Sequence, residues 1–188
     1  MKKRLALLQM DVHVNDVEYN YNRVQELLTQ SLTENPDIIV LPETWNTGFH
    51  PSDDLITIAD RNGERTKSLL TAFAKEHNVN IVGGSVAVAK DDLVFNTSYA
   101  YNREGTLVGE YSKMHGFSPA KEDKYFASGT HTTHFELDGI PCSTVICYDI
   151  RFPELVRMAA LPGTELLFVP AQWPTMRLRH WQVLNEVR

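Results

Sequence analysis

Three side chains of complementary chemistry each follow a strand-like segment of this 188-residue chain: Glu43, Lys113 and Cys147. The end of a strand suits a reactive group, because the strand is rigid and the turn after it exposes the side chain. In such a trio the carboxylate can accept the thiol proton. An ammonium group 4 Å from a thiolate stabilises it by roughly 4 kcal/mol at an effective dielectric constant of 20, enough to favour ionisation. The three residue types therefore predict a hydrolase with a cysteine nucleophile.

The segments that must position these residues form a mixed α/β pattern. Strand-like residues 5–12 and 38–41 flank a helical repeat of apolar residues over 17–32, which implies two parallel strands joined by a right-handed crossover. The further expected elements are a helix around 69–74, strands over 80–88, 94–101, 106–113, 133–137, 142–147 and 166–169, and helices starting at Pro153 and Met176. Sites in open α/β sheets form at the carboxyl ends of strands, so the three residues could converge there.

The composition fits one domain that works on a small molecule. Hydrophobic residues make up 43% of the chain and charged residues 22%, and the net charge is −6, which disfavours binding to nucleic acid or to an anionic membrane. The basic start at Lys2 is followed by too short an apolar stretch for a signal peptide. Two cysteines provide no disulfide framework, so we expect a cytoplasmic protein with no nucleic-acid or membrane partner.

Three short blocks resemble the signature segments of the nitrilase superfamily of carbon–nitrogen hydrolases. They are Leu-Pro-Glu at 41–43, Tyr-Ser-Lys-Met-His at 111–115, and Ile-Cys-Tyr-Asp-Ile-Arg-Phe-Pro-Glu at 146–154. They occur in the order of that family, and the resemblance covers the chain from end to end. The third block is long, which makes a chance match improbable.

This resemblance implies a four-layer α-β-β-α sandwich and a Glu–Lys–Cys triad at the three residues named above, with no cofactor and no metal. The family's second glutamate, which holds the lysine, falls on Glu122 in the long loop over 116–130. Family members continue with further strands after the helix in which this chain ends, at Arg188. We therefore expect residues 1–188 to form a carbon–nitrogen hydrolase domain that is truncated at the C-terminus. Family members commonly assemble, which implies a homodimer or larger homo-oligomer.

The resemblance also favours one branch of the family. True nitrilases usually carry a tryptophan and a glutamate directly after the cysteine, whereas Tyr148 and Asp149 in this chain are typical of an amidase. Segments 169–174 and 180–181 resemble the ω-amidase-like branch, whose members hydrolyse the side-chain amides of 2-oxo acids such as 2-oxoglutaramate. The implied partners are a small amide and water, and the implied reaction releases ammonia through a cysteine thioester.

Several residues are candidates for binding the substrate: Tyr148, Phe117 and Trp173. The backbone N–H of Tyr148 would bind the oxyanion together with the lysine, whereas plain packing is an equal explanation for the other two aromatic rings. Arg151 could bind a substrate carboxylate. We favour an ion pair of Arg151 with Glu154 or Asp149 at the start of the next helix.

Other residues of the sequence suggest different kinds of site and function. A zinc deaminase site needs two residues between its cysteines, but four separate Cys142 from Cys147, and on a strand this spacing places them on opposite faces. A cysteine–histidine dyad with His115 or His180 remains an alternative. Two further functions also remain open: another hydrolase of the superfamily, acting on an N-carbamoyl compound or a nitrile, and a non-catalytic binding protein if the chain is truncated.

Overall fold

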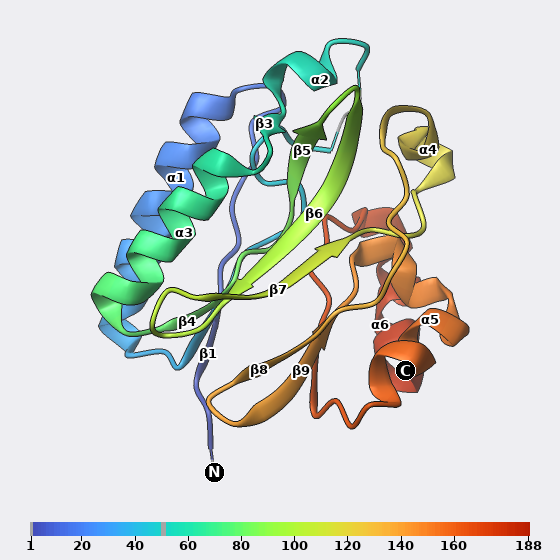
Figure 1. Ribbon diagram of the computed structural model, residues 1–188. Coiled ribbons are helices and arrows are strands. Elements are labelled where there is room, and N and C mark those ends of the chain that lie inside the picture. Colours follow the sequence, from blue (N-terminus) through green and yellow to red (C-terminus); the bar gives the residue numbers. More distant parts are fainter. Residues whose placement is uncertain (1, 50–51) are drawn as a thin grey trace.

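The computed structural model describes residues 2–49 and 52–188, which form four layers (Figure 1). Two sheets lie between two pairs of helices. The helices are α1 (Val17–Ser31) and α3 (Glu64–His77) on one side, and α5 (Pro153–Ala160) and α6 (Leu178–Val187) on the other. This arrangement confirms the expected α-β-β-α sandwich. None of the helices in these residues has the length and apolar character needed to cross a membrane.

The larger sheet has seven strands in the order β1-β2-β4-β6-β5-β3, with β7 paired to β6. The strands are β1 (Leu5–Leu7), β2 (Ile38–Val40), β3 (Asp60–Arg61), β4 (Asn80–Val82), β5 (Val86–Lys90), β6 (Leu93–Tyr101) and β7 (Leu107–Ser112). Strands β1, β2 and β4 are parallel, whereas β6 is antiparallel to β4, β5 and β7. The sheet is therefore mixed, as the sequence predicts.

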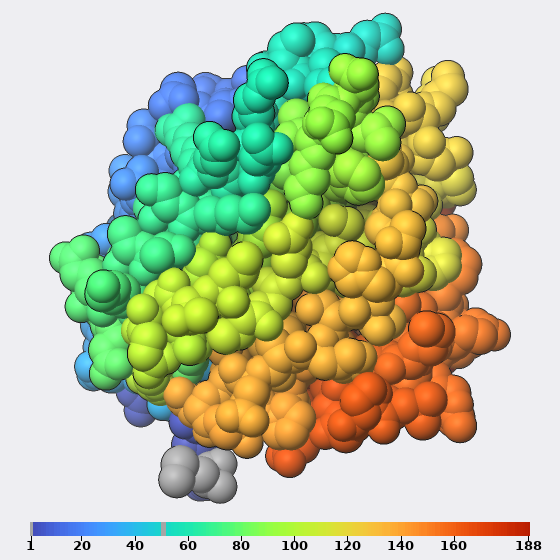
Figure 2. Space-filling view, in the orientation of Figure 1, coloured from blue at the N-terminus to red at the C-terminus, as the bar shows by residue number. Residues whose placement is uncertain are grey.

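The smaller sheet has the order β10-β9-β8, with strands β8 (His134–Leu137), β9 (Ile140–Thr144) and β10 (Leu166–Phe168). One buried apolar cluster joins the two sheets: Ile38, Val40, Val82, Ala100, Phe135, Leu137, Cys142 and Phe168. A second cluster joins α1 and α3 to the larger sheet, with Val24, Leu28 and Leu70 among its members. In the space-filling view, the segments coloured green to orange cover the face between the N-terminal helices and α5 (Figure 2).

The strand expected over 80–88 is broken in the structure. Residues Gly83, Gly84 and Ser85 separate β4 from β5, although both strands pair with β6. Gly84 has a φ of +61°, and a Cβ atom there would lie 1.9 Å from the carbonyl oxygen of Pro42. The break therefore lets the segment after β2 approach the sheet closely, which only glycine permits.

Two other expected strands are shorter than their apolar runs. The strand expected over 5–12 ends at Leu7, which pairs with the last residue of β2. The strand expected over 142–147 ends at Thr144, opposite the last residue of β10, and Pro170 lies two residues beyond β10. Regular pairing ends at these residues, although single backbone hydrogen bonds continue beyond them, such as the one from Cys147 to Pro170. The expected loop over 116–130 also contains the short helix α4 (Glu122–Tyr125), and α2 (Leu55–Ile58) is a further short helix.

Candidate active site

Lys113 lies directly after β7 and is 3% exposed. Its Nζ donates hydrogen bonds to Oε1 of Glu43 at 2.8 Å and to the two carboxylate oxygens of Glu122 at 3.0 and 2.8 Å. Burial alone would lower the pKa of Lys113, but the neighbouring carboxylates outweigh it and raise this pKa above its ordinary value. Lys113 is therefore an ammonium group at neutral pH, held between two carboxylates.

Glu43 lies in the turn after β2 and is fully buried. Besides the bond from Lys113, its carboxylate accepts a hydrogen bond from Nδ2 of Asn96 at 3.1 Å and one from the backbone N–H of Gln172 at 2.9 Å. The side chain of Gln172 also donates from Nε2 to the backbone carbonyl of Glu43 at 2.6 Å. Donors from three separate segments therefore fix the orientation of this carboxylate.

Glu122 is the first residue of α4 and is also fully buried. Its carboxylate accepts hydrogen bonds from Nδ2 of Asn96 at 3.0 Å and from the backbone N–H of Phe117. Burial raises the pKa of Glu122 although Lys113 acts in the opposite direction, and the carboxylate of Glu43 adds to the rise. The long loop thus places Glu122 where it holds Lys113, at the position implied by the family resemblance.

Cys147 begins the 3-10 turn Cys147–Arg151, which follows β9 after two residues. It has a φ of +47°, a strained value for a residue with a Cβ atom, and its N–H donates to the carbonyl of Pro170 at 2.9 Å. The next backbone N–H, that of Tyr148, has no hydrogen-bond partner in residues 2–49 and 52–188. The turn therefore presents a buried thiol beside a free N–H donor.

The thiol of Cys147 lies beside the carboxylate of Glu43 and close to Lys113. Burial raises the pKa of this thiol well above its ordinary value, and the Glu43 carboxylate adds to the rise more than Lys113 opposes it. Lys113 lowers the pKa of the thiol as expected, but burial and Glu43 outweigh it, so the thiol stays protonated in the resting protein. Glu43 is placed to take the proton at the moment of attack.

A hollow of about 320 Å³, its open mouth included, leads to Cys147. Its walls are Phe49, Phe117, Tyr148, Arg151, Gln172, Trp173, Pro174 and Arg177. The three aromatic residues expected to bind substrate therefore line the hollow together with Cys147, whereas Glu43 and Lys113 lie buried beside the cysteine. Phe49 and Arg177 are wall residues that the sequence analysis missed, since neither lies in a signature block.

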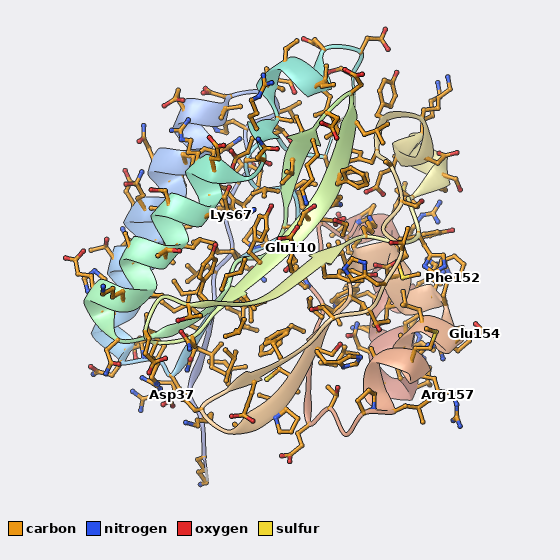
Figure 3. All side chains as sticks on the ribbon, in the orientation of Figure 1. Asp37, Lys67, Glu110, Phe152, Glu154 and Arg157 are labelled. Atoms are coloured by element: carbon orange, nitrogen blue, oxygen red, sulfur yellow. The ribbon has the colours of Figure 1, made fainter. Side chains whose placement is uncertain are left out.

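The expected ion pair of Arg151 is wrong. In the described part of the chain, Arg151 makes no ion pair with a carboxylate. Glu154 lies exposed on the outer side of α5 (Figure 3), and hydrogen bonds from other residues occupy the carboxylate of Asp149. The guanidinium group of Arg151 instead lies 5.1 Å from the ring centre of Trp173 and faces the hollow.

The histidines considered as partners of the cysteine are engaged elsewhere. Nδ1 of His115 lies 2.9 Å from Oδ1 of Asp149, and Nδ1 of His180 lies 3.5 Å from Nη2 of Arg151. Among residues 2–49 and 52–188, no group of three or more His, Cys, Asp or Glu side chains is arranged to hold a metal ion. The geometry favours the Glu–Lys–Cys trio over a cysteine–histidine dyad.

Comparisons with known proteins agree with this geometry. The family model for carbon-nitrogen hydrolases matches residues 4–188. The 2-oxoglutaramate amidase of Bacillus subtilis is 40% identical over 184 residues, which cover 98% of this chain and 70% of that protein. Omega-amidase NIT2 of Danio rerio is 30% identical over 200 residues, which cover 100% of this chain and 70% of that protein.

A solved structure supports the same family. XC1258 from Xanthomonas campestris, described as a CN-hydrolase superfamily protein with an arsenic adduct in its active site, has a TM-score of 0.85 and 29% identity. The match covers 97% of this chain and 69% of that one. This chain belongs to the carbon-nitrogen hydrolase family of the nitrilase superfamily, on the ω-amidase-like branch.

Proposed function

We propose that this protein hydrolyses the terminal amide of a small 2-oxo dicarboxylic acid monoamide, such as 2-oxoglutaramate, and releases ammonia. The observation that carries the proposal is the placement of the Cys147 thiol beside Glu43 and Lys113 at the end of a small hollow with an arginine in its wall. The names of the two amidase relatives, and the Tyr148 that follows the cysteine, support an amide rather than a nitrile as the substrate.

In the first step, the sulfur of Cys147 attacks the amide carbon while Glu43 takes the thiol proton. A carbon–sulfur bond forms and the carbonyl oxygen becomes an oxyanion, which Nζ of Lys113 and the free N–H of Tyr148 stabilise. Each such donor accelerates this type of reaction about 100- to 1000-fold. Lys113 stays charged and is held in place, and the proton taken up by Glu43 weakens the bond from Nζ to that carboxylate, so that this N–H can turn to the oxyanion.

In the second step, Glu43 gives its proton to the amide nitrogen as the carbon–nitrogen bond breaks, and ammonia leaves a thioester on Cys147. Water then attacks the thioester carbon while Glu43 accepts one of its protons. When the carbon–sulfur bond breaks, the sulfur regains a proton from Glu43 and the carboxylic acid is released. Glu43 thus returns every proton that it takes, and the cycle closes without a cofactor.

The charge of the hollow supports a substrate with a carboxylate. Arg151 lies in its wall without a carboxylate partner in the described residues, and Arg177 adds a second cation beside the ring of Phe117. A guanidinium group binds a carboxylate through two parallel hydrogen bonds. A monoamide with its carboxylate at the far end would place the amide carbon at Cys147 and the carboxylate at Arg151.

We also propose that the enzyme works in the cytoplasm, as a homodimer or larger oligomer. A reducing compartment keeps a nucleophilic thiol free, and both cysteines are free in the structure. Assembly is the expectation from the family resemblance. Sedimentation of the purified protein tests this point, since a species of 21.4 kDa would contradict it.

The central test is ammonia release from 2-oxoglutaramate. We expect Cys147→Ala to lower kcat by about 10,000-fold or more. Cys142→Ala is the matched control, because Cys142 is the other buried cysteine and packs between the two sheets, so its loss should leave kcat unchanged. Normal turnover by the Cys147→Ala variant would overturn the proposal.

A second arm tests the substrate class. Arg151→Gln should raise the KM for 2-oxoglutaramate by about tenfold or more while leaving kcat/KM for the uncharged butyramide unchanged. Faster turnover of a nitrile or an N-carbamoyl amino acid than of 2-oxoglutaramate would retain the cysteine hydrolase but replace the proposed substrate.

A further inference from the structure

Asp149 is a fully buried carboxylate that has no part in the reaction proposed above, although it lies two residues after the nucleophile. Its Oδ2 accepts hydrogen bonds from the hydroxyl of Tyr111 at 2.7 Å and from the backbone N–H of Ile146 at 3.0 Å. Its Oδ1 accepts the backbone N–H of His115 at 2.9 Å and lies 2.9 Å from Nδ1 of the same residue. Both oxygens are therefore fully engaged.

These donors come from the two segments that carry the reacting groups. Tyr111 and His115 stand two residues before and two residues after Lys113, whereas Ile146 directly precedes Cys147. One side chain thus connects the end of β7 to the turn after β9. Strands β7 and β9 belong to different sheets, and Lys113 and Cys147 lie in the loops that follow them. Pairing within either sheet therefore does not set the distance between the two loops.

The surroundings of Asp149 make this connection rigid. The ring of His115 stacks on that of Phe152 at 3.6 Å between centres and an angle of 9° between planes. Tyr111, Ile146 and Cys147 pack in one buried cluster. Burial and the Asp149 carboxylate raise the pKa of the Tyr111 hydroxyl, which keeps it a donor. Cys147 itself has a φ of +47°, so its turn needs such support to persist.

We propose that Asp149 is a positioning residue that sets the distance between the sulfur of Cys147 and Nζ of Lys113. Its carboxylate holds both segments at once. When the sulfur attacks the amide carbon, the oxyanion on the carbonyl oxygen therefore meets the lysine and the free N–H of Tyr148 together. The inference rests on the function proposed above. It differs from a merely structural role, which would affect stability and leave the chemical step of the folded enzyme unchanged.

The first test is Tyr111→Phe, which removes one donor and keeps the ring that packs beside Cys147. We expect kcat on 2-oxoglutaramate to fall about tenfold, with KM within about twofold of wild type, because the reacting groups move apart while the substrate site stays. The matched control is Tyr99→Phe. Tyr99 is equally buried, and its hydroxyl has no hydrogen-bond partner in the described part of the chain, so kcat and KM should not change.

The second test is Asp149→Asn, which keeps the size of the side chain but replaces one accepting oxygen with an NH2 group that cannot accept hydrogen bonds. We expect kcat to fall about 100-fold with little change in KM. If this variant does not fold, Tyr111→Phe decides alone. A kcat near that of wild type in the folded variants, or a rise in KM without a fall in kcat, would overturn the positioning role. Activity retained by Cys147→Ala would instead overturn the proposed function itself.

Discussion

Two ionic clusters in this molecule each join basic side chains to two carboxylates, and they differ in their surroundings. At the candidate active site, Lys113 is shared by Glu43 and Glu122, and none of the three side chains is more than 2% exposed. The second cluster centres on Arg103, which follows β6, and lies at the surface. The difference shows what each cluster is built to do.

In the surface cluster, Arg103 and Lys3 share the carboxylates of Asp138 and Asp37. Arg103 donates to Asp138 at 2.6 and 2.7 Å, and Asp37 lies near the start of β1 (Figure 3). These residues fasten the N-terminal segment and the β6–β7 turn to the β8–β9 turn, so they join the two sheets. Water screens their charges, and such pairs contribute little stability each.

The buried cluster cannot be explained in the same way, because a buried ion pair costs desolvation energy that its attraction only partly offsets. Apolar side chains of similar size would fill the same space at lower cost. Its value lies in a cation held ready at the thiol. Three substitutions distinguish a cluster made for chemistry from one made for fastening.

The largest effect is expected for Lys113→Met, which leaves two carboxylates facing each other in a buried site. We expect kcat/KM to fall by about 1000-fold or more and the free energy of unfolding at pH 7 to fall by about 3 kcal/mol. The loss of stability should shrink as the pH is lowered, because protonated carboxylates need no cation. Denaturant unfolding at pH 7 and pH 5 measures this, and an equal loss at both would contradict the explanation.

The next effect separates the two roles of Glu43. In Glu43→Gln we expect turnover to fall about 100- to 10,000-fold, because the general base is gone. Alkylation of Cys147 by iodoacetamide at pH 7 should nevertheless become faster, because the carboxylate that raises the pKa of the thiol has been removed and Lys113 remains. Slower alkylation than in wild type would show that Glu43 does not hold the thiol protonated.

The smallest effect is expected in the surface cluster. Hydrogen bonds from Arg103 hold the pKa of Asp138 below its ordinary value of about 4. This interaction therefore stabilises the protein fully above about pH 4, and the stabilisation is lost as the pH falls through the lowered pKa of Asp138. Asp138→Asn should therefore reduce the free energy of unfolding at pH 7 by about 1 kcal/mol and leave kcat/KM unchanged. A change in kcat/KM would contradict the conclusion that the surface cluster contributes to stability alone.

The positions of the reacting residues could be predicted because each follows a local pattern. Apolar runs mark the strands before Glu43 and Cys147, and an alternating run marks the strand before Lys113. The register between strands could not be predicted. A bulge between Ala100 and Tyr101 shifts the pairing of β6 with β7, so that Asn96 lies opposite Lys113 and donates to both glutamates. Without the bulge, Phe95 would lie opposite Lys113, facing the other side.

The protonation of Cys147 could not be predicted from the sequence either, because it depends on the three-dimensional structure. The sequence shows that Lys113 and Cys147 are oppositely chargeable, but it does not show how deeply the thiol is buried or how close Glu43 comes to it. Those two factors raise the pKa of the thiol more than Lys113 lowers it. Arg151, which has no carboxylate partner in the described residues, is a similar case, since its nearest carboxylates in the sequence turn out to be occupied or to face away.

The break in the larger sheet at Gly83–Ser85 bears on how this protein could be redesigned. The segment after β2 is bonded into that gap, with Ser85 donating its N–H to Pro42 and accepting those of Thr44 and Trp45. The segment that carries Glu43 is thus part of the backbone framework and tolerates little exchange. The outer wall at Pro174 and Arg177 belongs to exposed or half-exposed chain. Libraries that seek new acyl specificities should vary that rim and leave the glycines alone.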